Sequence, residues 1–294
     1  MSSYRFCRTD DIELLVAALN RCWAPYFPEE GVMTAAAFKR SIRDLQVWCS
    51  SCMVAFSGGD PIAVLIGAKR PSGTLVHKIA VHPDHRRQGH GRHLLASLAS
   101  KLAILGPPRI VAEVPESLIP ARALFAGCGY VEEALLKDYA LAGTALQKRG
   151  NGTRVGGPGL SAVEGFVIPV TVDDLQANGV LAEADAHLCW KRSVETLAAR
   201  KGDIAGLAVA SDERIEAYVL YVTRGPQDAE IVSLRSFIDD GGTRWAQLLS
   251  RLHAAGLASI SLNKVHPGEI PDESLQGLGF SPAGSHLLYA AKAA

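Results

Sequence analysis

The sequence has no excess of charge of either sign, no long apolar run and few aromatic residues. Lys plus Arg and Asp plus Glu each total 30, so the formal net charge is zero, which argues against a protein that holds a nucleic acid by bulk electrostatics. No stretch approaches the roughly 18 to 20 consecutive apolar residues that cross a bilayer, and the first residues lack the apolar core of a signal peptide. We therefore expect a cytoplasmic protein with neither a nucleic-acid nor a membrane partner.

The six cysteines show no disulfide framework of the kind that small secreted domains use. One pair, Cys49 and Cys52, has C-x-x-C spacing, and with the downstream His82 and His85 it allows a zinc or redox site to be considered. The apolar run that follows Cys52 favours a different interpretation, a thiol packed in a strand of the core. We expect no metal site.

The length of 294 residues predicts two domains, at about 150 residues per domain. Residues 143–165 contain seven glycines and no amphipathic period, which is typical of a flexible linker. The sequence therefore predicts a first domain over 1–142 and a second over 166–294.

Hydrophobic periodicity predicts a mixture of strands and helices in the first domain. Thr9, Asp10 and Asp11 are placed to cap a helix that begins near Ile12. The predicted strands are 4–8, 53–56, 63–68, 75–81, 109–114 and 131–141, and the predicted helices are 12–19, 34–45, 89–103 and 119–126. This order indicates an α+β or α/β fold.

The second half repeats this layout. Thr171-Val-Asp-Asp-Leu175 echoes Arg8-Thr-Asp-Asp-Ile12, and Leu278-Gly279-Phe280 parallels Cys128-Gly129-Tyr130. Strands are predicted over 166–170, 207–210, 217–221 and 230–236, with a helix ending near Leu252. We interpret this as a duplication of one domain.

The chemically informative segment is Ile79-Ala-Val-His-Pro-Asp-His-Arg-Arg-Gln-Gly-His-Gly-Arg92, a strand, a basic glycine-containing loop and a helix. The first turn of a helix leaves backbone N–H groups unpaired and carries partial positive charge, which favours anions. Arginines add charge to this site. The alternative is a glycine turn with solvated arginines.

Two motifs in this segment and beyond it resemble the GNAT acyltransferase superfamily. Arg86-x-x-Gly89-x-Gly91 fits the family's pyrophosphate loop, and it follows the Val81-x-Pro83 lead-in. Ala121-x-x-Leu124-Phe125-x-x-x-Gly129-Tyr130 comes about 40 residues later, in the family's order. The resemblance covers about residues 4–142, and the second half only in layout. It implies two tandem GNAT-like domains, each a mixed, mainly antiparallel twisted sheet flanked by helices.

The resemblance implies acetyl-CoA as co-substrate and no metal. A bulge of the family's kind would orient the thioester carbonyl near the strand that ends at Val81. Main-chain groups of Ile79, Ala80 and Val81 would pair with the pantetheine arm. The implied pyrophosphate-binding residues are Arg86, Arg87, Gln88, Gly89, His90, Gly91 and Arg92.

Direct transfer to an amine needs a general base and benefits from a proton donor for the departing thiolate. Glu113 matches the base position of family members, although it could instead be a solvent-facing strand-end carboxylate. The rival bases are His77, His82 and Glu116.

The sequence departs from the family pattern at two positions. Phe125 stands where the family often has the tyrosine that protonates the thiolate, and Leu118 where it often has an asparagine. Either Tyr130 or water replaces the acid, or protonation matters less here; Tyr130 also suits a place in the core.

Tyr26, Glu29 and Glu30 could recognise a cationic amine, although an ordinary proline-bounded loop is the alternative. In the second half, Asp239 and Asp240 occupy the loop position, where carboxylates would repel phosphate. We therefore expect the second domain to be degenerate and non-catalytic. Its expected role is structural: covering one face of the first domain, shaping the acceptor cleft or forming a homodimer.

The expected function is transfer of an acetyl group from acetyl-CoA to a small-molecule or peptide amine. The alternatives are a non-catalytic acyl-CoA-binding or regulatory module, and an acyltransferase for another acyl group or a non-amine acceptor.

Overall fold

The chain forms two compact units. The structure, a computed structural model, describes residues 2–142, 165–181 and 188–293. One unit combines Met1–Ala134 with His286–Ala294, and the other comprises Leu135–Ser285. The predicted linker, apart from Gly165, lies outside the described residues.

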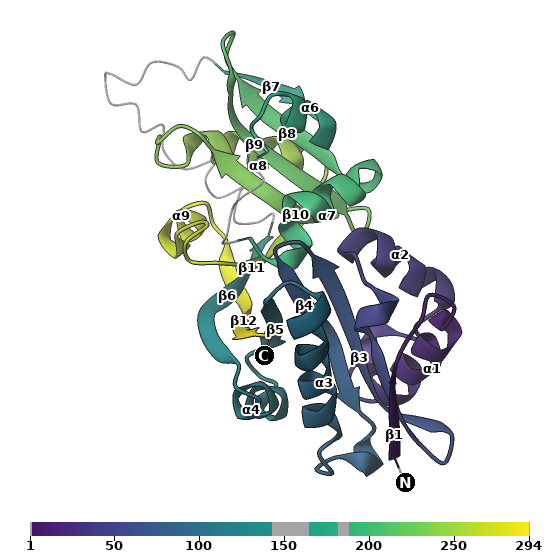
Figure 1. Ribbon diagram of the computed structural model, residues 1–294. Helices are drawn as coiled ribbons and strands as arrows, with labels where there is room; N and C mark the ends of the chain where they lie inside the picture. The colour runs from purple at the N-terminus through teal and green to yellow at the C-terminus, as the bar shows by residue number, and fades with distance from the viewer. Residues whose placement is uncertain (1, 143–164, 182–187, 294) are drawn as a thin grey trace. The chain divides into compact units, whose positions relative to one another are not determined.

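The first unit is a mixed sheet with helices (Figure 1). Its strand order is β1-β2-β3-β4-β5-β12, in which β4 and β5 are parallel and the other neighbours are antiparallel. The elements are β1 (Ser2–Phe6), α1 (Ile12–Cys22), η1 (Pro28–Glu30), α2 (Ala35–Leu45), η2 (Cys49–Ser51), β2 (Met53–Ser57), β3 (Asp60–Arg70), β4 (Gly73–Val81), η3 (Pro83–His85), α3 (His90–Leu105), β5 (Arg109–Pro115), α4 (Ile119–Gly127) and the end of β12 (Ser281–Lys292).

The second unit repeats this architecture. Its strand order is β7-β8-β9-β10-β11-β6, with β10 and β11 parallel. The elements are β6 (Val131–Ala142), β7 (Phe166–Pro169), α6 (Val172–Ala177), η4 (Trp190–Arg192), α7 (Val194–Ala199), η5 (Lys201–Asp203), β8 (Ala205–Ala210), β9 (Ile215–Thr223), β10 (Asp228–Ser236), α8 (Thr243–Ala254), β11 (Ser259–Val265) and α9 (Asp272–Gly277). The mixed, mainly antiparallel α+β fold predicted from the sequence is confirmed.

The last strands of the two repeats are exchanged. Residues 286–292 of β12 pair antiparallel with β5 in the first unit, whereas β6 pairs antiparallel with β11 in the second. The units thus differ from the predicted ranges 1–142 and 166–294. The physical reason is that β6 and β12 follow equivalent helices and fill equivalent places, so hydrophobic pattern alone does not identify the partner of either strand.

The core of the first unit lies around β3. Every residue from Ile62 to Ala68 is buried, and both α1 and α3 pack against this strand. A continuous buried run of this kind requires cover on both faces of the sheet. The apolar face predicted for α3 is confirmed, because Leu94, Leu95, Leu98 and Leu102 are buried.

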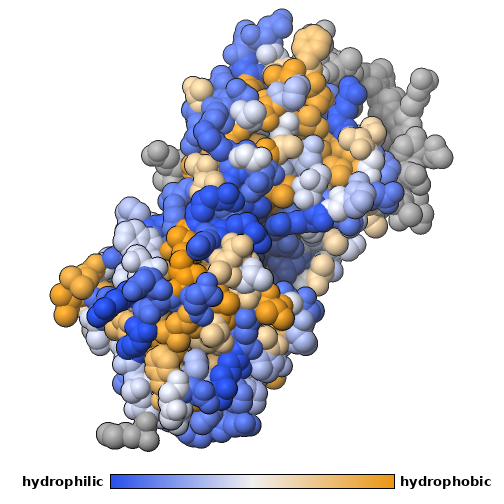
Figure 2. All heavy atoms as spheres, turned by 90° about the vertical axis from the view of Figure 1, so that its right-hand side faces the viewer, coloured by the Kyte–Doolittle hydropathy of each residue, from blue (hydrophilic) through white to orange (hydrophobic). Residues whose placement is uncertain are grey.

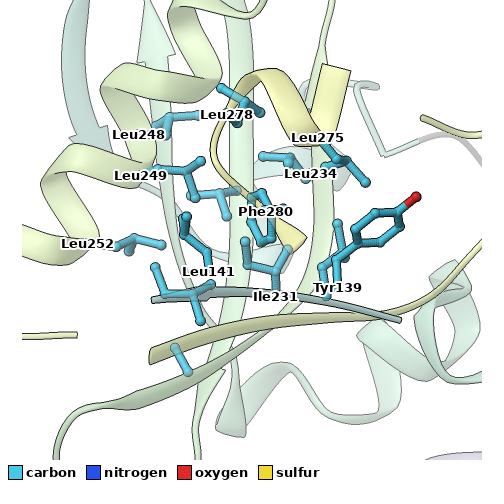
Figure 3. Packing of buried hydrophobic residues seen from close by; sticks show 14 of the residues in the cluster. Tyr139, Leu141, Ile231, Leu234, Leu248, Leu249, Leu252, Leu275, Leu278 and Phe280 are labelled. Carbon is cyan, nitrogen blue, oxygen red and sulfur yellow. The ribbon is translucent and has the colours of Figure 1, made fainter. Parts of the chain in front are cut away.

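The core of the second unit lies between α8 and its sheet (Figure 3). Leu248, Leu249 and Leu252 project from α8 toward Phe280 and Ile231, and all five are buried. Burying each such side chain contributes about 1.5–3 kcal/mol. This packing holds α8 against its sheet.

Apolar side chains at the surface occur in groups among polar ones on the face drawn in Figure 2. Among the large exposed hydrophobic residues, Val32, Ile104, Ile119 and Phe166 belong to different segments. No helix among the described residues has the length and apolarity needed to cross a membrane.

The predicted start of α1 at Ile12 is confirmed, but the predicted cap is not. Asp11 occupies the N-cap position and makes no capping hydrogen bond with its side chain. Its carboxylate instead accepts hydrogen bonds from the Arg8 N–H at 2.7 Å and from the Arg5 guanidinium. These donors hold the pKa of Asp11 below its usual range.

Candidate active site

The candidate site begins where β4 and β5 separate. The two parallel strands pair at Thr74–Ile110 and Leu75–Val111. Beyond this point Ile79, Ala80 and Val81 keep their antiparallel partners on β3. Since a strand pairs along two edges, the β5-facing edge of this part of β4 is available to a ligand that pairs like a strand.

A β-bulge lies within this part of β4. The pairing with β3 shifts between Ile66–Lys78 and Gly67–Val76, which leaves His77 as the extra residue. Bulges redirect side chains and interrupt regular pairing, and they are common beside functional sites. The bulge expected near here is therefore present.

The basic loop after β4 forms an anion cradle at the start of α3. Arg87 has φ 62° and Gly89, the N-cap of α3, has φ 85°. The first helical hydrogen bond runs from the His93 N–H to the Gly89 carbonyl at 3.0 Å, so the N–H groups of residues 90–92 have no acceptor within the helix. A non-glycine residue in the left-handed region, such as Arg87, is uncommon and is often found at functional sites.

The two glycines of the loop have different surroundings. A Cβ at Gly89 would have no heavy atom within 4 Å, whereas a Cβ at Gly91 would lie 3.0 Å from Leu124 Cδ2. Gly89 thus leaves open space for an anion, and Gly91 allows α3 to approach α4 closely. The part of Gly89 and Gly91 in binding a pyrophosphate stays a prediction.

Three side chains of the loop, those of Arg86, Gln88 and His90, each contact a different part of the first unit. The Arg86 guanidinium lies 5.8 Å from the centre of the Tyr26 ring, and the Gln88 amide donates to the Asp84 carbonyl at 3.5 Å. His90 is only 4% exposed, and its Nδ1 lies 2.6 Å from the Tyr4 hydroxyl. Burial, followed by the nearby His85 and His93, lowers the pKa of His90. Because the His90 imidazole is enclosed and favours its neutral form, it is the main-chain N–H of His90, not the side chain, that suits an anion.

Of the catalytic candidates, Glu113 lies beside the separation of β4 and β5 and Tyr130 lies in the core. Glu113 is half-buried on β5, two residues beyond the last β4–β5 pair, Leu75–Val111. Tyr130 packs edge-to-face on Phe125, with ring centres 5.1 Å apart. Its buried hydroxyl has no hydrogen-bond partner among the described residues, and burial raises the pKa of Tyr130.

The rival bases are spread around the same region. His77 is the bulged residue of β4, and His82 Nδ1 accepts the Asp84 N–H at 3.4 Å. Glu116 is exposed after β5, and its carbonyl accepts a hydrogen bond from Arg122.

Two of the three predicted acceptor residues, Tyr26 and Glu30, contact β4. The Tyr26 hydroxyl donates to the Val81 carbonyl at 2.7 Å, and the Glu30 carboxylate pairs with the Lys78 ammonium. Glu29 is exposed. Glu30 also accepts a hydrogen bond from the Trp23 indole at 3.1 Å. Its charge is therefore compensated within the protein, and its part in recognising a cationic amine stays a prediction.

The sequence reasoning missed Lys78 and Tyr289. The Lys78 ammonium lies 3.9 Å from the centre of the Trp23 ring, a cation–π contact, and its side chain is largely buried. A lysine inside a largely apolar strand was the available signal. Tyr289 reaches the first unit from the last strand and packs near-parallel to Phe125 at 5.9 Å, which no local pattern could indicate.

In the second unit an internal carboxylate fills the corresponding anion position. Gly241 and Gly242 both have positive φ, and Gly242 is the N-cap of α8. The Asp240 carboxylate accepts the N–H groups of Gly242 at 3.0 Å, Thr243 at 3.1 Å and Arg244 at 3.0 Å. It also pairs with the Arg244 guanidinium at 2.7 Å. Asp240 therefore takes the hydrogen bonds that a phosphate would need.

The electrostatics agree with this filled position. Partial burial opposes ionisation of Asp240, but its hydrogen bonds from Arg244 and the helix N–H groups hold its pKa below the usual range. The Arg244 guanidinium is held in turn by the Glu216 carboxylate at 2.7 Å.

The loop before α8, which contains Asp239 and Asp240, lines a cavity of about 360 Å³. Phe237 and Trp245 line the same cavity.

The C-x-x-C pair is buried in the first unit. Cys49 and Cys52 are free thiols, and the Cys52 thiol donates to the Trp48 carbonyl at 3.3 Å. Burial raises the pKa of both thiols. Among the described residues no group of three or more His, Cys, Asp or Glu side chains is arranged to hold a metal ion.

Comparisons with known proteins agree with the fold and the loop. Residues 13–130 match the acetyltransferase (GNAT) family. This match covers part of the first unit and includes the loop at residues 86–92. A search of curated proteins found no significant match.

Two solved structures resemble the whole chain. A tandem GNAT protein from the clavulanic acid biosynthesis pathway, solved without AcCoA, is 17% identical, with a TM-score of 0.64 over 100% of this chain and 99% of that one. A GCN5-related N-acetyltransferase from Sphaerobacter thermophilus is 14% identical, with a TM-score of 0.66 over 99% and 95% of the two chains. At these identities the similarity establishes the fold.

Proposed function

We propose that the first unit transfers an acetyl group from acetyl-CoA to an amine by direct attack, without a covalent enzyme intermediate. The observation that carries this proposal is the loop at residues 86–92, which leads into α3 near the point where β4 and β5 separate. Unpaired N–H groups at a helix start suit a pyrophosphate. The free edge of β4 suits the amides of a pantetheine arm, which pair as a peptide does.

In this proposal Glu113 accepts the proton of the amine. Residues 110, 112 and 114 of β5 are buried, whereas Glu113 lies on the alternate face. The carboxylate therefore occupies one face of the sheet beside the separation of the strands. An amine arriving on that face would lose its proton to Glu113 as it attacks the thioester carbonyl.

We assign the acceptor pocket to the region of Trp23, Tyr26 and Glu29. Tyr26 is bonded to the carbonyl of Val81 and so lies next to the proposed pantetheine strand. The pairing of Lys78 with Glu30 supports a pocket with little net charge from these two groups. A small-molecule or peptide amine fits this proposal.

The second unit is non-catalytic in this account. Its anion position is filled by Asp240, which supports a structural role. The residues assigned to catalysis lie in the first unit, which includes the end of the last strand of the chain.

The test is release of CoA thiol from acetyl-CoA in the presence of a panel of primary amines, with the acylated product identified by mass spectrometry. The proposal predicts acceptor-dependent thiol release. Tight acetyl-CoA binding without thiol release would instead identify a binding or regulatory module. Release that depends only on hydroxyl or thiol acceptors, or only on another acyl-CoA, would change the assigned reaction.

A further inference from the structure

The Phe125 side chain cannot act as a general acid, but the rings of two tyrosines pack against it. Tyr130 meets it edge-on, and Tyr289 lies nearly parallel to it, with an interplanar angle of 16°. Phe125 is the position where the superfamily pattern often has its acid. A proton donor for the thiolate leaving group is therefore to be sought among the neighbours of this ring.

We propose that Tyr289, carried into the first unit by the exchanged strand β12, donates the proton to the departing CoA thiolate. The inference rests on the proposed function, because it assigns a further group to that same reaction. The inference goes beyond the proposed function because it makes the last strand of the chain part of the catalytic site.

The register of β12 places Tyr289 at the level of the strand separation. Tyr289 pairs with Ala112, and Ala112 is the first residue of β5 beyond its last pair with β4, Leu75–Val111. Antiparallel partners point to the same face of a sheet. Because Ala112 has only a methyl side chain, the longer tyrosine can extend over it toward the space between β4 and β5.

The same register separates the acid from the base. Glu113 pairs with Leu288, so these two residues share one face, whereas Ala112 and Tyr289 share the other. Phe125 of α4 also packs on the face of Tyr289. A base and an acid on opposite faces can serve the two ends of one reaction, the attacking amine and the leaving sulfur.

Tyr130 is less suited to this role. Both tyrosines are buried, Tyr130 at 6% and Tyr289 at 5% exposed, but only the hydroxyl of Tyr130 is a fully enclosed oxygen without a hydrogen-bond partner among the described residues. Tyr130 follows the turn at Gly129, and its ring meets that of Phe125 edge-on. An enclosed hydroxyl would need the core to open before it reached a ligand.

The proposed step balances in atoms and electrons. The amine nitrogen forms its bond to the carbonyl carbon, and its proton goes to Glu113. The carbon–sulfur bond breaks and its electron pair stays on sulfur. The Tyr289 O–H proton then passes to that sulfur, giving the free thiol, and the tyrosinate regains a proton from water.

The experiment compares Tyr289→Phe with Tyr221→Phe, which removes a hydroxyl from half-buried Tyr221 on β9 of the second unit. Loss of a general acid typically costs about 10²–10⁴ in rate. We expect Tyr289→Phe to lower kcat at least tenfold with unchanged acetyl-CoA affinity, and Tyr221→Phe to change neither. Adding Phe125→Tyr to Tyr289→Phe should restore much of the rate. A full rate in Tyr289→Phe, or a loss confined to Tyr130→Phe, would overturn the inference.

A binding measurement separates this inference from the proposed function. The absorbance of the CoA thiolate, followed against pH in the binary complex, reports the pKa of the bound thiol. A hydroxyl that donates to the thiolate lowers this pKa, so Tyr289→Phe should raise it. An unchanged thiol pKa with normal CoA binding would contradict the role of Tyr289 alone. Failure of the wild-type protein to bind CoA would contradict the proposed function as well.

Discussion

Asp240 illustrates how a single side chain can occupy a binding position from within the protein. Its carboxylate receives three main-chain N–H groups at the start of α8. Asp239, its neighbour, is exposed. The two aspartates were both expected to repel phosphate, but the structure gives them different roles, because only Asp240 is held by the helix.

Replacing Asp240 should therefore destabilise the second unit. Loss of a capping carboxylate costs about 0.5–2 kcal/mol, so we expect Asp240→Ala to lower the free energy of unfolding by about 1 kcal/mol. Asp239→Ala is the matched control, with a change within about 0.5 kcal/mol. Urea denaturation measures both, and equal losses would contradict the assignment.

The effect should also depend on pH. The pKa of Asp240 is lower in the folded protein than its usual value, so its contribution is present above the unfolded pKa of about 3.9. It is lost as the pH falls through the lower folded pKa. The difference between wild type and Asp240→Ala should therefore shrink in acid, and a difference that grows below pH 4 would contradict the direction of the shift.

At Glu113, removal of the carboxylate should slow the reaction without preventing binding. We expect Glu113→Gln to lower kcat about 100-fold, since a general base contributes about 10²–10⁴. The loss should be largest at low pH, where the amine is protonated. Glu116→Gln, an exposed change nearby, serves as the comparison. An unaltered pH–rate profile in Glu113→Gln would assign the base to another residue.

At the scale of elements, the exchanged strand makes the first unit depend on the end of the chain. Seven residues of β12, from His286 to Lys292, pair with β5, and the Ala293 N–H donates to the Pro108 carbonyl at 2.7 Å. Without them β5 would become an exposed edge beside the proposed active site. The strand also delivers Tyr289 to Phe125.

A truncation tests this dependence. Ending the chain at Ser285 should remove hydrogen-exchange protection from residues 109–115 of β5 and abolish acetyl-CoA turnover, while β8 and β9 remain protected. Ending it at Lys292 keeps every pair with β5 and should preserve both. Retained protection of β5 in the shorter chain would show that the first unit folds without β12.

For the molecule as a whole, the sequence predicted the mixed fold, the repeat of the layout and most element positions. The strong signals were local ones, such as the apolar face of α3 at Leu94 and Leu98, and the glycine at position 89. The exchange of β6 and β12 could not be predicted, because both strands fit either sheet. Contacts between distant segments, such as Lys78 with Glu30 and Tyr289 with Phe125, depend on the tertiary fold.

The central claim is that the chain has one acyl-CoA site, at the start of α3, because the equivalent position at α8 is filled. Gly89 and Gly242 form a matched pair, since both are helix N-caps with φ near 85°. A glutamate at either position strains the backbone similarly, but only at Gly89 would it place a carboxylate in the proposed phosphate site.

Calorimetric titration with acetyl-CoA measures this directly. The account predicts one acetyl-CoA bound per chain in the wild type and in Gly242→Glu, and none in Gly89→Glu. Two molecules bound per chain, or undiminished affinity in Gly89→Glu, would contradict it.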